Sequence, residues 1–323
     1  MTSAARTLAL ALVVLTVLTG CGSTGSDSTT VDSTATAPYP ATRAYPGVAV
    51  LTDLDYGAQN AGTLLDVCLP ADVAEPASAA GTTEPATTTE PTRAAVLSVH
   101  GGSWRQGDKD DVAWRSVCEW LASEGFVAVS VNYALAPEHP FPAGIDDVRT
   151  AVKWLRENAQ VERFNIDPAR IGALGGSAGG NLVSLLGAGG SGPLDSGSRV
   201  AAVVDLSGPA DLTTAGFSLG GVISTFRTIQ LAYLGCASYS DCPQARAASP
   251  LYSVDRSDPP FFVGHSLDEI IPQEQSEALV EKLRGAGVSV EFVTVEGTRH
   301  SIAMLDPEMR ERISTWLRDR LAG

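Results

Sequence analysis

The chain has 323 residues, of which 44% are hydrophobic and 18% charged, a balance typical of globular proteins and sufficient for a large core. Its 37 acidic and 22 basic residues give a net charge of −15, which disfavours electrostatic binding to nucleic acids or anionic lipid headgroups. A mean hydropathy of +0.08 with one long apolar run excludes a protein with several membrane spans.

That apolar run, residues 7–18, follows Arg6 and has the pattern of a secretory signal peptide. It ends in Leu18-Thr19-Gly20-Cys21, which resembles a bacterial lipobox, whose cysteine is lipidated and becomes the mature N-terminus. An ordinary signal peptide with a nearby cysteine is the alternative. We expect residues 1–20 to be a lipoprotein signal peptide and Cys21 to be the lipidation site. We therefore expect the mature protein to be exported and to be held at the membrane only through its N-terminal lipid.

The next segment, residues 21–46, is rich in Ser and Thr and has no apolar period. Such a segment buries too little apolar surface to offset its chain entropy, so it predicts a disordered tether. A second biased tract, residues 71–93, lies between two strand-like runs and predicts a long solvated loop. One folded domain is expected over residues 47–323.

The five cysteines agree with export. Setting Cys21 aside leaves four, an even number, as expected in an oxidising compartment. Cys236 and Cys242 are close in sequence and are expected to form a disulfide. Cys68 and Cys118 could also pair, although we favour buried free thiols. No Cys/His spacing resembles a zinc site, and we expect neither metal nor cofactor.

From residue 48 onward, short β-branched runs alternate with helical patterns. Predicted strands cover residues 48–52, 64–69, 94–99, 126–131, 171–174, 201–206, 260–264 and 288–295. Predicted helices cover residues 111–123, 146–159, 178–186, 273–284 and 307–321, the last with Asp306 as N-cap. The alternation predicts an α/β fold with a mostly parallel twisted sheet and helices on both faces. Functional groups in such folds lie on loops at the carboxyl ends of the strands.

The strongest motif follows the predicted strand at residues 171–174. There the chain reads Gly175-Gly176-Ser177-Ala178-Gly179, a G-x-S-x-G pattern between a strand and a helix. Glycines on a very tight turn remove collisions with the strand and helix, so that the Ser177 hydroxyl can project above the sheet. A glycine-rich turn with an incidental serine is the alternative.

A serine hydroxyl becomes a good nucleophile only when a base removes its proton and a carboxylate orients that base. The chain has four histidines. The order serine, acid, histidine favours His300 as the base for Ser177 and Asp268 as the orienting acid. Glu269 is the alternative acid. His265 is an alternative base, but it would precede its acid.

A third motif, His100-Gly101-Gly102-Ser103-Trp104, directly follows the predicted strand at residues 94–99. Acyl transfer builds negative charge on a carbonyl oxygen, which fixed backbone N–H groups can stabilise. Gly101 and Gly102, together with Ala178 after the serine, are the expected oxyanion-hole donors. His100 is expected to hold the loop rather than to transfer protons.

Together these motifs resemble the α/β-hydrolase superfamily, and within it carboxylesterases similar to hormone-sensitive lipase and to small feruloyl and acetyl esterases. The resemblance covers roughly residues 48–321 and is carried by HGGSWRQGDK (100–109), VNYALAPEHPFPAGIDDV (131–148), IDPARIGALGGSAGGNL (166–182), ASPLYSV (248–254) and HSLDEIIP (265–272). It implies the α/β-hydrolase fold, with Ser177 as nucleophile, Asp268 as acid and His300 as base. Ser103 follows the two glycines where the hormone-sensitive-lipase branch has a third, which favours the feruloyl-esterase-like and arylformamidase-like branches.

The resemblance also implies a short lid, for which residues 213–247 are the candidate. Trp104 and Phe217 are candidate pocket walls, with packing in the core or on the surface as the alternative. The implied activity is hydrolysis of small or short-acyl carboxylic esters through an acyl-enzyme on Ser177. An amidase, peptidase or arylformamidase with the same triad is an alternative, as is a non-catalytic surface lipoprotein that uses the fold for binding.

Overall fold

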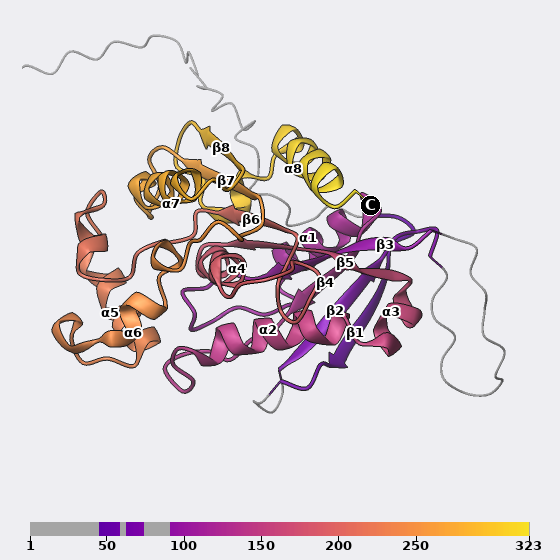
Figure 1. Cartoon of the computed structure of the whole chain (residues 1–323), viewed down its shortest axis with the longest axis horizontal. Coiled ribbons are helices and arrows are strands. Elements are labelled where there is room, and N and C mark those ends of the chain that lie inside the picture. Colours follow the sequence, from indigo (N-terminus) through magenta and orange to yellow (C-terminus); the bar gives the residue numbers. More distant parts are fainter. Residues whose placement is uncertain (1–44, 59–62, 74–90, 323) are drawn as a thin grey trace, which may run out of the picture. The chain divides into compact units, whose positions relative to one another are not determined.

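The computed structural model describes residues 45–58, 63–73 and 91–322 (Figure 1). The predicted signal peptide, Cys21 and nearly all of the predicted tether lie outside the described residues, as does most of the predicted loop at residues 71–93. Within the described part, no helix has both the length and the apolar character needed to cross a membrane.

Eight strands form one sheet, in the order β1-β2-β4-β3-β5-β6-β7-β8. The pairs β1/β2 and β2/β4 are antiparallel, and all other neighbours are parallel. The strands are β1 (Ala49–Asp55), β2 (Leu64–Leu69), β3 (Arg93–Val99), β4 (Val127–Val131), β5 (Ile166–Gly176), β6 (Ala202–Leu206), β7 (Phe261–Ser266) and β8 (Val290–Val295). The mostly parallel sheet that the sequence predicts is therefore confirmed.

Helices connect the parallel strands and also form a cluster between β6 and β7. The α-helices are α1 (Val112–Ser123), α2 (Ala143–Leu155), α3 (Asn158–Phe164), α4 (Ala178–Ala188), α5 (Ser224–Leu234), α6 (Pro243–Ala247), α7 (Gln273–Gly285) and α8 (Pro307–Arg320). Short 3-10 turns are η1 (Ala215–Ser218), η2 (Tyr239–Asp241), η3 (Pro250–Tyr252) and η4 (Ser301–Met304). The predicted N-cap of the last helix is correct, because the Asp306 side chain accepts a hydrogen bond from the Met309 N–H.

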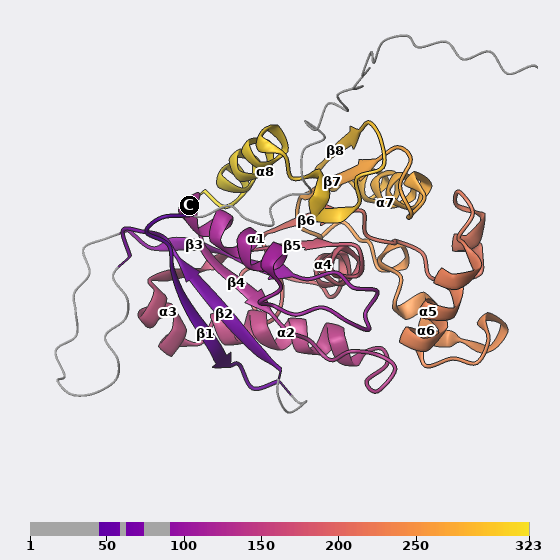
Figure 2. The same cartoon turned by 180° about the vertical axis from the view of Figure 1, so that it is seen from behind.

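The sheet separates two hydrophobic cores, and β3 contributes to both because its side chains alternate. Ala95, Leu97 and Val99 enter the core that α2, α3, α4 and α7 cover. Ala94 and Val96 enter the core that α1 and α8 cover. Helices thus shield both faces of the central strands (Figure 1 and Figure 2). The residues that the sequence predicts as functional follow β3, β5, β7 and β8 in the chain, at the carboxyl edge of the sheet.

The helix predicted at residues 146–159 differs from the structure. It begins earlier, at Ala143, and ends at Leu155, after which α3 forms separately because Glu157 is extended (ψ 137°). The cause is tertiary: the Arg156 guanidinium donates hydrogen bonds of 2.7–3.0 Å to four backbone carbonyl oxygens, those of Pro168, Leu194, Gly197 and Arg199.

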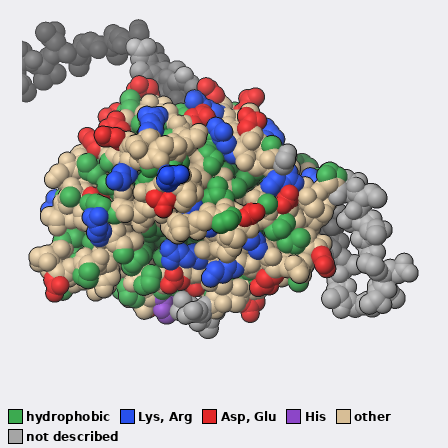
Figure 3. All heavy atoms as spheres, viewed as in Figure 1, with side chains coloured by type: hydrophobic (Ala, Val, Ile, Leu, Met, Phe, Trp, Pro, Cys, Tyr) green, Lys and Arg blue, Asp and Glu red, His purple; other side chains and the backbone are tan. Residues whose placement is uncertain are grey.

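The surface carries charges of both signs. On the face drawn in Figure 3, Lys and Arg side chains are interspersed with acidic, hydrophobic and neutral ones. Several of the basic groups are engaged in ion pairs, as where Arg318 contacts Glu124 and Arg312 contacts Glu291.

Two disulfides lie in the described residues. The predicted Cys236–Cys242 bond is confirmed. The expectation that Cys68 and Cys118 are free thiols is wrong, since they are bonded to each other. β2 and α1 pack together and bring the two Cα atoms to 5.9 Å, within the range for a disulfide.

The two disulfides should differ in their contribution to stability. The cysteines of the Cys68–Cys118 bond are 50 residues apart and those of the Cys236–Cys242 bond are 6 apart. By chain entropy, the loss is about 4 kcal/mol of unfolding free energy for the longer loop and about 2 kcal/mol for the shorter. Urea unfolding of Cys68→Ala/Cys118→Ala and of Cys236→Ala/Cys242→Ala, without reductant, measures the difference. Equal or reversed losses would contradict this expectation.

Candidate active site

Ser177 lies on the turn between β5 and α4, and its backbone is strained. Its φ of 57° and ψ of −121° fall in a region that residues other than glycine rarely adopt. The Ser177 N–H donates to the Leu206 carbonyl at 2.9 Å, and its own carbonyl accepts from the Asn181 N–H at 3.0 Å. β6 and α4 therefore hold the turn from two sides and leave the serine half-buried at the carboxyl edge of the sheet.

The glycines around Ser177 are required by close approach. A Cβ on Gly175 would lie 2.3 Å from the Gly179 carbonyl oxygen. A Cβ on Gly179 would lie 2.0 Å from the Val99 carbonyl oxygen at the end of β3. The G-x-S-x-G pattern is thus a consequence of how tightly β3, β5 and α4 pack at this turn, which supports the interpretation of the sequence over an incidental serine.

His300 approaches the same turn from the loop after β8. A Cβ on Gly176 would lie 2.0 Å from the Ser301 hydroxyl oxygen, so the chain neighbours of Ser177 and His300 are in direct contact. Ser177, His300 and Ser301 line one cavity of about 630 Å³. The His300 side chain is 25% exposed, and its Nδ1 contacts the Glu269 carboxylate.

The prediction of Asp268 as the orienting acid is wrong. The Asp268 side chain is exposed, and its backbone N–H donates to the Gly297 carbonyl at 3.0 Å. This bond and that from the Leu267 N–H to the Val295 carbonyl fix the turn after β7. The carboxylate that this turn directs toward His300 belongs to Glu269, the alternative acid in the sequence.

Glu269 has a fully buried side chain between two histidines. Its Oε2 contacts His300 Nδ1, and its Oε1 lies 2.8 Å from His265 Nε2. Burial raises the pKa of the Glu269 carboxyl, but the hydrogen bonds and charges of the two histidines outweigh burial and leave the pKa below its ordinary value. Glu269 is therefore ionised at neutral pH. His265, fully buried in β7, is outside the cavity lining and cannot serve as the base.

The loop after β3 places two glycines beside Ser177. Gly101 and Gly102 line the cavity, and Gly102 has a φ of 113° that favours glycine. Within the described residues, the N–H groups of Gly101, Gly102 and Ala178 donate no hydrogen bond. Ala178 is the first residue of α4, where helix N–H groups lack intrahelical acceptors. These three N–H groups, which the sequence predicts as oxyanion-hole donors, are thus available to a bound group, and that role stays a prediction.

His100 holds this loop. Its Nδ1 pairs with the Gly101 carbonyl at 2.7 Å, and its ring stacks on Tyr133 with centroids 4.3 Å apart. The Tyr133 hydroxyl donates to the His100 carbonyl at 3.0 Å. Burial lowers the pKa of the His100 imidazole. This neutral, buried ring orients the loop of Gly101 and Gly102 and does not line the cavity.

The expected lid does border the cavity. Ile223, Thr225, Phe226 and Ile229, all within residues 213–247, line it. The aromatic walls, however, are Trp114 and Phe226.

Trp104 and Phe217, the candidate pocket walls in the sequence, do not line the cavity. Trp104 is buried against Tyr233, and Phe217 packs against Tyr239 with Arg227 over its ring. Their roles are in packing, the alternative that the sequence left open.

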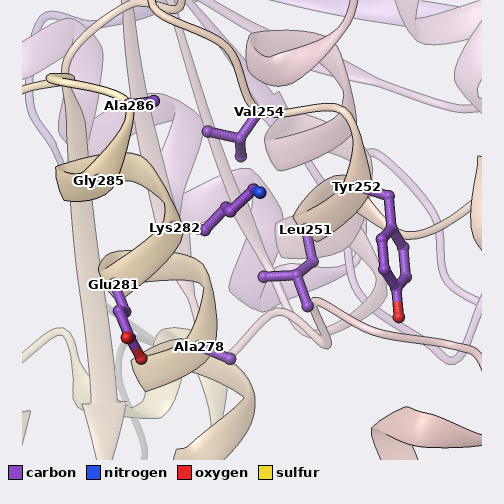
Figure 4. A pocket seen from close by; sticks show the side chains of 8 residues that line it. All are labelled: Leu251, Tyr252, Val254, Ala278, Glu281, Lys282, Gly285 and Ala286. Carbon is purple, nitrogen blue, oxygen red and sulfur yellow. The ribbon is translucent and has the colours of Figure 1, made fainter.

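A second cavity, of about 580 Å³, lies between η3 and α7 (Figure 4). Leu251, Val254 and Ala286 form its apolar walls, and Lys282 extends between them. None of the groups around Ser177 lines it, so it is not part of the candidate active site. Among the residues that the structure describes, no group of three or more His, Cys, Asp or Glu side chains could hold a metal ion.

Comparison with known proteins agrees with this arrangement. Residues 83–283, more than half of the chain, match the family model BD-FAE. The chain belongs to the BD-FAE family. The matched segment of this BD-FAE member includes Gly101, Ser177 and Glu269 and ends before His300.

Individual relatives extend the comparison. Esterase LipC of Mycobacterium tuberculosis is 34% identical over 220 residues, which are 65% of this chain and 53% of LipC. Esterase LipQ of the same organism is 30% identical over 267 residues, which are 78% of this chain and 57% of LipQ. This BD-FAE member thus spans somewhat over half the length of these relatives.

Solved structures share the fold of this BD-FAE member. A truncated carbohydrate esterase from gut microbiota superposes with a TM-score of 0.69 and 24% identity, covering 85% of this chain and 97% of that chain. The α/β-hydrolase fold predicted from the sequence is confirmed.

The buried carboxylate should make stability depend on pH. The folded-state pKa of Glu269 lies below its ordinary value of 4.5, so its contribution is present above that value and lost as pH falls through the folded pKa. Glu269→Gln should therefore flatten the rise of unfolding free energy with pH in the acidic range at and below the ordinary value of 4.5. Denaturant unfolding at several pH values measures the slope. Asp268→Asn, at the exposed neighbour, is the matched control, and an equal flattening in that variant would contradict the assignment.

Proposed function

We propose that the protein is a serine esterase that hydrolyses carboxylic esters through an acyl-enzyme on Ser177. The observation that carries the proposal is the convergence of Ser177, His300 and the Gly101-Gly102 loop on one cavity. Glu269 behind His300 completes a nucleophile, base and acid in the chain order of α/β-hydrolases. The names of the relatives, esterase LipC and esterase LipQ, support the same chemistry.

The reaction follows from the contacts. Glu269 engages His300 Nδ1, so that nitrogen carries the proton and Nε2 keeps the lone pair that accepts a proton from the Ser177 hydroxyl. Ser177 attacks the ester carbonyl, and His300 then protonates the leaving alcohol. In the second half, His300 activates a water molecule that releases the acid from Ser177. The ionised Glu269 stabilises the imidazolium in both halves.

The tetrahedral intermediates need donors for their oxyanion. The N–H groups of Gly101, Gly102 and Ala178 are fixed by the tight turn and by the start of α4, so little reorganisation is required when the charge develops. Removing one such donor typically costs about 100- to 1,000-fold in turnover.

The cavity fits a small ester. Its volume of about 630 Å³ lies within the usual range for small-molecule sites. Trp114, Phe226 and Ile229 give it apolar walls for a short acyl or alcohol group. Small, short-acyl esters are thus the substrate class that we propose.

Hydrolysis of p-nitrophenyl acetate and butyrate tests the proposal. Ser177→Ala should lower kcat at least about 10,000-fold, because it removes the hydroxyl that forms the acyl-enzyme. Release of p-nitrophenol measures it, and the unfolding temperature shows whether the variant is folded. An inactive parent protein across acyl lengths would contradict catalysis and favour a binding protein. Faster cleavage of the matching anilides would instead favour an amidase.

We also propose that the protein is exported and held at a membrane by a lipid on Cys21. The apolar run after Arg6 and the sequence Leu18-Thr19-Gly20-Cys21 support this. The two disulfides fit an oxidising compartment.

Expression in a bacterial host with labelled palmitate tests the lipid attachment. The parent protein should carry the label and sediment with membranes, and Cys21→Ser should lose both properties. A labelled Cys21→Ser protein, or an unlabelled parent, would contradict the proposal.

A further inference from the structure

His265 is a second imidazole on the Glu269 carboxylate, on the side away from His300. Its side chain is fully buried in β7. Nε2 lies 2.8 Å from Glu269 Oε1 and 2.8 Å from the Ile271 carbonyl oxygen, and Nδ1 lies 2.7 Å from the Ser276 hydroxyl. Every polar atom of this ring is thus engaged.

The partners decide where the ring protons are. Nε2 faces two oxygens that can only accept, so it must carry a hydrogen. Nδ1 faces the Ser276 hydroxyl, which can donate or accept, so this contact survives in either charge state of the ring. His265 therefore keeps an N–H at Nε2, beside both Glu269 and the Ile271 carbonyl, whether the ring is neutral or protonated.

Glu269 depends on this N–H. Its Oε2 is engaged by His300, whereas its Oε1 makes no well-aligned hydrogen bond to any described residue. The N–H of His265 points more directly at Ile271, so its contact with Oε1 is a close polar contact at 2.8 Å. Without His265, this fully buried oxygen would lose the close N–H contact that compensates its desolvation, and no described residue would hold Oε1 in place.

We propose that His265 is a positioning residue, which holds the Glu269 carboxylate in the orientation that His300 requires. The proposal rests on the proposed esterase function. The contact from His300 to Glu269 then continues to His265 and ends at Ser276 on α7. These contacts attach the Glu269 carboxylate to strand β7 and helix α7, and not only to loops.

The charges around His265 favour its protonated form. Glu269 faces it from the following loop and Asp205 from β6, while α7 presents the neutral Ser276. Burial lowers the pKa of His265, but Glu269, the Ile271 carbonyl and Asp205 together raise it above its ordinary value. A positive charge on His265 offsets part of the Glu269 charge that acts on His300. A neutral residue at position 265 should therefore make His300 easier to protonate.

Two substitutions separate positioning from packing. His265→Ala removes the donor, and His265→Gln replaces the ring by a neutral side chain with an N–H₂ group at a similar reach. Asp268→Asn, an exposed neighbour outside the site, is the matched control. The measurements are kcat and KM for p-nitrophenyl butyrate, the pH profile of kcat/KM, and the unfolding temperature of each variant.

His265→Ala should lower kcat about 10- to 100-fold with KM within about twofold, a loss like that for outer partners of metal-bound histidines. His265→Gln should recover kcat to within about threefold of the parent. It should also move the acid limb of the kcat/KM profile to higher pH, because the neighbouring positive charge is gone. Purely structural packing would lower the unfolding temperature and leave that limb in place.

The outcomes distinguish the two proposals. A parent protein without ester turnover refutes the esterase function itself. An active parent whose folded His265→Ala variant keeps kcat within about twofold refutes only the positioning role. The same holds if His265→Gln is folded and as impaired as His265→Ala, or if its acid limb does not move.

Discussion

The buried carboxylate of Glu269 is the constraint on which the site depends. A fully desolvated charge costs several kcal/mol unless hydrogen bonds and opposite charge compensate it. Both polar contacts of this carboxylate within the described residues are imidazoles, His265 in β7 and His300 after β8. The carboxylate therefore joins β7 to the loop after β8, and the contact that compensates its charge also fixes the position of His300.

The strained backbone of Ser177 is a second feature of the site that the surrounding structure must stabilise. A non-glycine residue at a φ of 57° and ψ of −121° is strained by about 1–3 kcal/mol. Hydrogen bonds to Leu206 and Asn181 and the close approach of Val99 to Gly179 hold it. Three strands and a helix thus hold the turn, which fixes the position of the Ser177 side chain at the edge of the sheet.

The sequence predicts the parts of this protein that local chemistry determines. Glycines at fixed offsets from Ser177 indicate the tight turn, which the structure shows between β5 and α4. The order of serine and histidine indicates His300 as the base, and the structure brings His300 and Ser177 to one cavity. The acid could not be chosen, because Asp268 and Glu269 are consecutive and have the same chemistry. Only the turn after β7, set by backbone bonds to Val295 and Gly297, directs one of them inward.

Contacts across the fold limited the other predictions in the same way. Arg156 ends a helix because it reaches four carbonyl oxygens of distant loops. Cys68 and Cys118 pair because β2 packs on α1. The local sequence around Arg156 or Cys68 does not indicate these partners, because it does not determine which distant segment packs against the residue.

Trp104 follows Gly101, Gly102 and Ser103 and connects several parts of the fold. Its ring stacks on Tyr233 of α5 with centroids 4.3 Å apart, and its Nε1 donates to Asn181 of α4 at 3.2 Å. Asn181 in turn donates to the carbonyl oxygens of Pro209 and Ala248. One buried side chain therefore joins the loop after β3, helix α4 and helix α5. On the preceding turns of α5, Phe226 and Ile229 line the cavity, so the cavity wall is linked through Trp104 to the loop that carries Gly101 and Gly102. Trp104 therefore supports the cavity through the residues that it packs against, although it does not line the cavity itself.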